Sequence, residues 1–209
     1  MKNINIIAVV LALIVGAIGG YSISRSASVS PIKNDSNMTE SETTQTPSIP
    51  SKTNDEKITN AMSAAPVAIA KDATILDWPA KDGDPFPSLR TGTNNWTCLP
   101  DYPVSPGNDP LCVDKTAMQW FQAYLEHKTP KLAQAGLAYM LQGGSDPSNT
   151  DPYATEPKPG ESWMSAPPHV MIFSSQKLDT KVYGTDPDAG KPWIMWADTP
   201  YEHIMMPVK

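Results

Sequence analysis

Histidine and methionine recur with the same spacing near the C-terminus. His169 and Met171 are two residues apart in HVMIF, and His203 and Met205 repeat this spacing in HIMM. Residues two apart share one face of a β-strand, so each pair would present an imidazole and a thioether together. Copper, especially Cu(I), prefers these ligands, and Met195 could add another thioether. The two pairs therefore form a candidate copper site, with plain core packing as the alternative.

A second cluster carries oxygen ligands. Asp146, Asn149 and Asp151 lie in GGSDPSNTDPY, and together with backbone carbonyls they supply the hard oxygens that calcium takes. The segment lacks the twelve-residue loop with a terminal Glu that marks a specific calcium site. Asx turns would use the same side chains without an ion, so calcium and turn formation both stay open.

The two cysteines bracket a stretch with no hydrophobic core of its own. Cys98 and Cys112 enclose CLPDYPVSPGNDPLC, which is rich in Pro, Gly, Asp and Asn. A disulfide across this loop would stabilise the fold by roughly 3 kcal/mol through loop closure. The alternative, a thiol pair for redox or metal chemistry, fits poorly because the spacing is unlike that of CxxC sites. We predict a structural disulfide, which is typical of an exported protein.

Familiar catalytic and nucleic-acid-binding patterns are absent from the sequence. The chain has no GxSxG elbow for a serine nucleophile, and Gly143 and Gly144 lack the Lys of a phosphate-binding loop. Arg occurs only at positions 25 and 90, and residues 60–209 hold 17 acidic against 11 basic side chains. Nucleic acid is thereby excluded as a partner. We expect a binding or envelope-interaction module, with an extracytoplasmic hydrolase of unrecognised site as the alternative.

Six Trp suggest another kind of binding surface. Trp193 and Trp196 lie near the end of a predicted strand, where an exposed indole could stack on a glycan or anchor an envelope protein. Their spacing places them on opposite faces of that strand. The alternative is that the Trp side chains fill the core, since the chain has only three Phe.

The N-terminal part predicts the location of the protein. Residues 4–23 are almost continuously apolar and follow Lys2, which is the length and flank of a membrane-spanning signal anchor. Residues 1–23 are therefore predicted as an anchor or signal peptide and residues 24–57 as a disordered tether. The globular domain, residues 58–209, would face the periplasm or cell surface, or be secreted if the signal is cleaved.

The domain is predicted to be α+β, with an antiparallel sheet, one principal helix and Pro-rich loops, because its 19 Pro permit only short elements. The principal helix is expected over residues 114–127, with Asp114 as N-cap and an apolar stripe at helical spacing. Shorter helices are expected over residues 58–64 and 66–71. Strands are expected over residues 73–78, 136–141, 169–174, 193–196 and 203–208.

Several whole phrases resemble a family of small exported bacterial proteins of uncharacterised function. They are AMSAAPVAIAKDATILDW, GTNNWTCLPDYP with NDPLCVDKTAMQW, YMLQGGSDPSNTDPYAT, PPHVMIF and WIMWADTPYEHIMMPV. The resemblance spans nearly all of residues 58–208. It implies a single exported domain and supplies no activity, substrate or site residue.

Overall fold

The computed structural model describes residues 52–81, 83–187 and 191–208. The predicted anchor and all of the tether before residue 52 lie outside these ranges. No helix within them is long and apolar enough to cross a membrane. The chain's second compact unit, Ser51–Lys209, contains every element described below.

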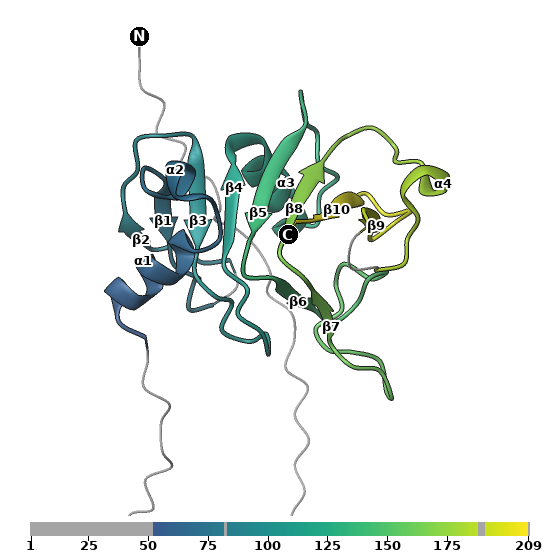
Figure 1. The fold of residues 1–209 in the computed structure, drawn as a ribbon, viewed down its shortest axis with the longest axis horizontal. Coiled ribbons are helices and arrows are strands. Elements are labelled where there is room, and N and C mark those ends of the chain that lie inside the picture. The colour runs from purple at the N-terminus through teal and green to yellow at the C-terminus, as the bar shows by residue number, and fades with distance from the viewer. Residues whose placement is uncertain (1–51, 82, 188–190, 209) are drawn as a thin grey trace, which may run out of the picture. The chain divides into compact units, whose positions relative to one another are not determined.

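A mixed eight-stranded sheet forms the centre of this unit (Figure 1). Its strands follow the order β2-β1-β3-β4-β5-β8-β10-β9, and all neighbouring pairs are antiparallel except β1 and β3, which are parallel. The strands are β1 (Thr74–Leu76), β2 (Ser88–Arg90), β3 (Trp96–Leu99), β4 (Leu111–Asp114), β5 (Gly136–Met140), β8 (His169–Phe173), β9 (Trp193–Met195) and β10 (His203–Pro207). A separate two-stranded ribbon pairs β6 (Gly144–Asp146) with β7 (Met164–Ala166).

Four helices accompany the strands in the described residues: α1 (Asn54–Met62), α2 (Val67–Ala70), α3 (Lys115–Leu125) and α4 (Thr180–Tyr183). The predicted principal helix is α3, and Asp114 is its N-cap as expected, because one carboxylate oxygen accepts from the Ala117 N–H at 2.7 Å. The second oxygen accepts from the Leu137 N–H of β5, so the cap also joins the helix to the sheet. The predicted α+β class and small helix content are confirmed.

The first helix begins earlier than the sequence pattern indicated. The hydrophobic pattern predicts a helix start at residue 58, directly after a tether that ends at residue 57. In the structure α1 starts at Asn54, so the predicted tether is wrong over its last residues. Thr53 and Glu56 form a capping box, in which each side chain accepts from the backbone N–H of the other. This cap lies outside any apolar period, so hydrophobicity alone does not reveal it.

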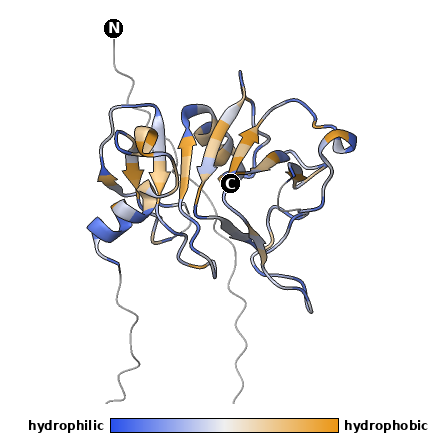
Figure 2. Ribbon diagram, in the orientation of Figure 1, coloured by the Kyte–Doolittle hydropathy of each residue, from blue (hydrophilic) through white to orange (hydrophobic). Residues whose placement is uncertain are grey.

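Two hydrophobic clusters lie on opposite faces of the sheet. Cys98 and Cys112 belong to the cluster under α1 and α2, whereas their neighbours Leu99 and Val113 belong to the cluster under α3. Figure 2 shows the central strands as mainly hydrophobic and the start of α1 as hydrophilic. The alternation follows from the period of two along a strand.

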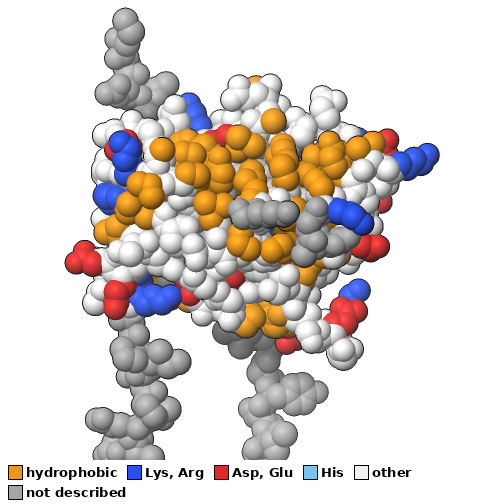
Figure 3. All heavy atoms as spheres, viewed as in Figure 1, with side chains coloured by type: hydrophobic (Ala, Val, Ile, Leu, Met, Phe, Trp, Pro, Cys, Tyr) orange, Lys and Arg blue, Asp and Glu red, His pale blue; other side chains and the backbone are white. Residues whose placement is uncertain are grey.

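The face of β5, β8 and β10 that lies opposite α3 is also apolar. Leu137, Ile172 and Ile204 lie side by side on it, since the register pairs each with the next. Figure 3 shows that hydrophobic side chains gather broadly on one face of the molecule.

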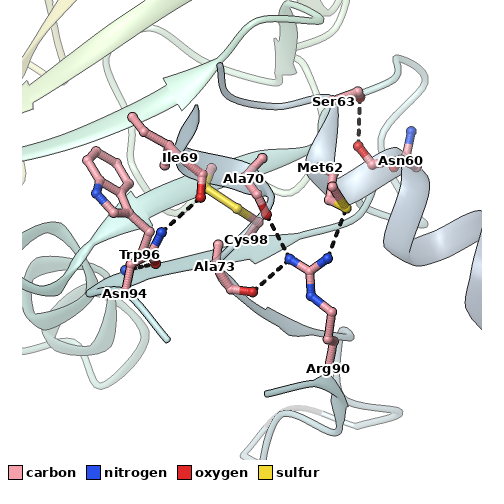
Figure 4. Close-up of a disulfide and its surroundings, with 11 residues drawn as sticks. Asn60, Met62, Ser63, Ile69, Ala70, Ala73, Arg90, Asn94, Trp96 and Cys98 are labelled. Atoms are coloured by element: carbon pink, nitrogen blue, oxygen red, sulfur yellow. Dashed lines mark hydrogen bonds between the residues drawn. A yellow bond between two sulfur atoms is a disulfide. The ribbon is translucent and has the colours of Figure 1, made fainter. Parts of the chain in front are cut away.

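The predicted disulfide is present. Cys98 and Cys112 lie directly opposite each other on β3 and β4, are bonded, and are fully buried. Figure 4 shows this bond beside the α2 region. The long connection between β3 and β4 is thus fastened within the sheet at its base.

Replacing both cysteines by Ala should lower the free energy of unfolding by about 3 kcal/mol, because the unfolded chain regains the freedom of a 15-residue loop. Urea unfolding of the oxidised protein and the double variant measures this. A fall below about 1 kcal/mol would mean that strand pairing alone fixes the loop.

Arg90 uses its guanidinium to join β2 to the α2 turn (Figure 4). Its Nη2 donates to the carbonyls of Ala70 and Ala73 at 2.7 and 2.8 Å, and Nη1 donates to the Met62 sulfur. The only Arg in the described residues therefore has a structural role.

Arg90→Ala should cost about 2 kcal/mol of stability, because two carbonyls lose charge-assisted bonds. Arg90→Lys should recover only part of this loss, since an ammonium lacks the planar fork. Thermal and urea unfolding of both variants provide the comparison. Equal stability of Arg90→Ala and the unchanged protein would contradict the assignment.

Candidate functional site

A cavity of about 160 Å³ lies between α3, the large sheet and the β6–β7 ribbon. Aromatic and aliphatic side chains form most of its wall. Its polar groups include the side chains of His169, His203, Asp146 and Ser145. All four candidate copper ligands from the sequence, His169, Met171, His203 and Met205, line this one cavity.

Five methionines line the cavity: Met140, Met164, Met171, Met195 and Met205. Met171 and Met205 are direct cross-strand partners on β8 and β10. Such partners share a face, with Cβ atoms about 5 Å apart. Two thioethers therefore lie together near the middle of the cavity floor.

Each histidine has a methionine as its own cross-strand neighbour. Met140 of β5 pairs with His169 of β8, and Met195 of β9 pairs with His203 of β10. Each imidazole thus stands beside a thioether on the cavity face. The repeated HxM spacing in the sequence predicts only the methionine two residues along the same strand. It does not predict the methionine on the neighbouring strand.

His169 is oriented by a carbonyl and carries a free lone pair. Its Nδ1 lies 2.7 Å from the Pro167 carbonyl, which can only accept, so Nδ1 holds the proton and Nε2 is an acceptor. The residue is 1% exposed, and Nε2 has no hydrogen-bond partner in the described parts of the chain. Burial lowers the pKa of the imidazole. His169 is therefore neutral at pH 7 and offers an unused ligand atom.

Gly144 allows His169 and Met140 to approach the β6–β7 ribbon. A Cβ at Gly144 would lie 3.0 Å from Met140 Cε and 3.5 Å from His169 Cε1. The sulfur of Met140 lies 3.6 Å from the same point. The thioether and the imidazole thus meet at the backbone of this glycine.

His203 occupies an aromatic environment. Its Nδ1 lies 2.9 Å from the Tyr201 carbonyl, so it has the same tautomer as His169. The ring centroids of Phe173, Trp196 and Trp120 lie 5.1, 5.2 and 5.4 Å from its own. Burial lowers the pKa of His203 to about 4, and the nearby His169 acts in the same direction. Both imidazoles are consequently uncharged at neutral pH.

The two histidines rise from opposite ends of the cavity floor. His203 pairs with Phe173, four residues beyond His169 on β8. The backbone positions of the two histidines are therefore roughly 13 Å apart in the direction of the strands. In each histidine, Nδ1 donates to the carbonyl two residues earlier, and this hydrogen bond fixes the orientation of the ring.

Asp146 is the acidic side chain of the cavity wall. Burial raises its pKa to about 7, against the effect of the hydrogen bond from the Ser148 N–H, and the nearby Asp109 raises it further. A substantial fraction of Asp146 is therefore protonated at neutral pH.

The three candidate calcium ligands have protein partners. The Asn149 side-chain oxygen accepts from the Trp193 indole at 3.2 Å, and Asp151 accepts from the Tyr153 N–H in an Asx turn. Asp146 makes a similar turn with Ser148. Among the residues with described positions, no group of three or more His, Cys, Asp or Glu could hold a metal ion. Calcium remains an untested prediction, and these bonds account for the three side chains without it.

The tryptophans do not form an exposed platform. Trp120, Trp193 and Trp196 are buried in one cluster, and the other three are half-buried. The expectation that Trp193 and Trp196 face opposite sides is wrong, because Trp196 follows the end of β9 with φ 54°, which breaks the alternation. The indoles of both donate to the Ser148–Asn149 segment.

Comparison with family models, curated proteins and solved structures found no match to this chain. The resemblance to small exported bacterial proteins stays a prediction, and the cavity is the basis for assigning a function.

Proposed function

We propose that this protein binds the soft monovalent ion Cu(I) in the cavity, outside the cytoplasm. The observation that carries the proposal is His169, whose Nδ1 is fixed by a carbonyl while its buried Nε2 has no partner in the described chain. Metal-bound histidines use this same arrangement, because the second hydrogen bond fixes the tautomer and the ring. The surrounding thioethers supply the other ligands that Cu(I) prefers.

We assign the ion to the His169 end of the cavity. Met140 is the cross-strand neighbour of His169, and Met171 follows it on the same face of β8. Met205 lies beside Met171 and extends the set of thioethers. His203 starts at the other end of the cavity floor, opposite Phe173 of β8, so we assign it no bond to the ion.

The charge of the cavity favours a monovalent ion. Both imidazoles are neutral, and burial keeps Asp146 partly protonated. The cost of burying an ion grows with the square of its charge, so a divalent ion requires anionic ligands that this wall largely lacks. Cu(I) and Ag(I) should therefore bind in preference to Zn(II) and Cu(II).

The disulfide supports an extracytoplasmic location, because such bonds persist in oxidising compartments. Methionine ligands also suit that setting, where a free thiol would be oxidised. The hydrolase alternative has less support, since the Ser145 hydroxyl of the cavity donates to Asp109. A glycan or envelope-protein partner remains a prediction.

Anaerobic titration with Cu(I) against a chromogenic Cu(I) chelator tests the proposal, with native mass spectrometry reporting stoichiometry. The expected result is one Cu(I) or one Ag(I) per chain and no stoichiometric Zn(II). Met140→Leu should weaken binding at least tenfold. Met118→Leu is the matched control, because Met118 packs against the same core without lining the cavity.

No uptake at micromolar free Cu(I) would end the proposal. Equal uptake of Zn(II) and Cu(I) would contradict the claim that the nearly uncharged wall favours a monovalent ion.

A further inference from the structure

A second unpaired polar atom lies in the cavity wall, and the metal proposal does not use it. Trp120 of α3 is 4% exposed, and its Nε1–H has no hydrogen-bond partner in the part of the chain that the structure describes. Buried donors without partners are rare in native proteins. This indole N–H therefore needs an explanation.

Neighbouring indoles of the same fold are paired. Trp78 donates to the Pro100 carbonyl at 2.7 Å, Trp196 donates to the Ser148 carbonyl at 2.9 Å, and Trp193 donates to Asn149. Trp120 differs from them in lining the cavity with an unused donor. A metal cation cannot accept its hydrogen, so bound Cu(I) would leave this donor unpaired.

The cavity has room for such a ligand. Its volume of about 160 Å³ is far more than one ion occupies. An apolar cavity of about 150 Å³ lined by Leu, Ile and Phe is large enough to bind benzene. Near Trp120 the wall is aromatic, with Phe173 at 4.4 Å and Trp196 at 6.2 Å between ring centroids. Flat aromatic walls suit a flat ligand.

The charge of the wall favours a neutral ligand. No Lys or Arg is among the described residues that line the cavity, so an anion would have no fixed positive partner. A carbonyl oxygen is a neutral acceptor that the Trp120 N–H can satisfy. We propose that the cavity binds a small aromatic carbonyl compound of about benzene's size, with its oxygen accepting from Trp120 Nε1–H. This site goes beyond the Cu(I) proposal and does not depend on it.

The test compares two nearly isosteric probes, benzaldehyde and styrene, on the metal-free full domain by calorimetry or NMR titration. Styrene replaces the carbonyl oxygen by a CH₂ group that cannot accept. The ratio of benzaldehyde affinity to styrene affinity should fall at least about tenfold in Trp120→Phe, because the buried donor is lost. Trp78→Phe is the matched control and should keep the ratio, since the Trp78 indole already bonds Pro100.

An unchanged ratio in Trp120→Phe would overturn the inference, as would failure of benzaldehyde to bind the unchanged protein at millimolar concentration. If Trp120→Phe does not fold, the NMR chemical shift of the Trp120 indole N–H in the unchanged protein tests the hydrogen bond instead. It should move further downfield with benzaldehyde than with styrene, and identical responses would refute the hydrogen bond. Because no metal is present, failure here leaves the Cu(I) titration unaffected.

Discussion

Replacing His169 by Ala should weaken Cu(I) binding at least about 100-fold, because it removes the one nitrogen ligand that is already oriented and unpaired. Loss of a residue that merely supports a ligand costs metal sites 10-fold to 100-fold, so loss of the ligand itself should cost more. Chelator competition at fixed pH measures the change, and circular dichroism checks that the variant is folded.

His127→Ala is the matched control for His169→Ala. His127 stacks on Tyr153 just after α3 and does not line the cavity, so its loss should leave affinity unchanged. His203→Ala should have a smaller effect than His169→Ala. A larger loss in His203→Ala would move the ion to the aromatic end of the cavity and contradict the assignment.

Asp146→Asn should raise the free energy of unfolding at pH 7.5 by about 4 kcal/mol. Burial raises the pKa of Asp146 in the folded protein to about 7, from an ordinary value of 3.8. A group with a raised folded pKa stabilises the fold at low pH and loses this contribution as pH rises through the folded pKa. One pKa unit corresponds to about 1.4 kcal/mol, and the loss falls between about pH 4 and 7.

Asn keeps the oxygen that accepts from the Ser148 N–H but carries no charge. The variant therefore does not lose stability as pH rises through the pKa of Asp146. The lowered pKa values of the buried His169 and His203 make the free energy of unfolding rise with pH over this range. This effect is the same in Asp146→Asn and in the unchanged protein, so it cancels in the difference between them. Urea unfolding between pH 4 and 7.5 should show a stability difference that grows with pH. Asp151→Asn, which retains an equivalent turn on an exposed loop, should track the unchanged protein. A constant difference between Asp146→Asn and the unchanged protein would refute buried-carboxyl titration.

The sequence predicted those parts of the fold and site that depend on local patterns. Asp114 reads as an N-cap from its place before an apolar helical stripe, and the cap is present. His169 with Met171 and His203 with Met205 share a face because spacing of two on a strand requires it. The disulfide followed from the cysteine count and the loop that the cysteines enclose.

The parts that depend on long-range pairing could not be predicted. Met140 becomes a neighbour of His169 only through the register of β5 with β8. Met164 and Trp120 reach the cavity because the β6–β7 ribbon and α3 close over the sheet, which no local pattern encodes. The sequence pattern does not predict the two strands that the disulfide joins, because β3 and β4 are only four residues long and the loop between them is rich in Pro.

X-ray diffraction from Cu(I)-loaded crystals, with data collected on both sides of the copper absorption edge, tests the central claim most directly. The predicted result is one anomalous peak inside the cavity, at bonding distance from His169 Nε2 and from the sulfur of Met140 or Met171. A copper peak only at the protein surface, or an empty cavity in protein that carries one bound Cu(I), would contradict it.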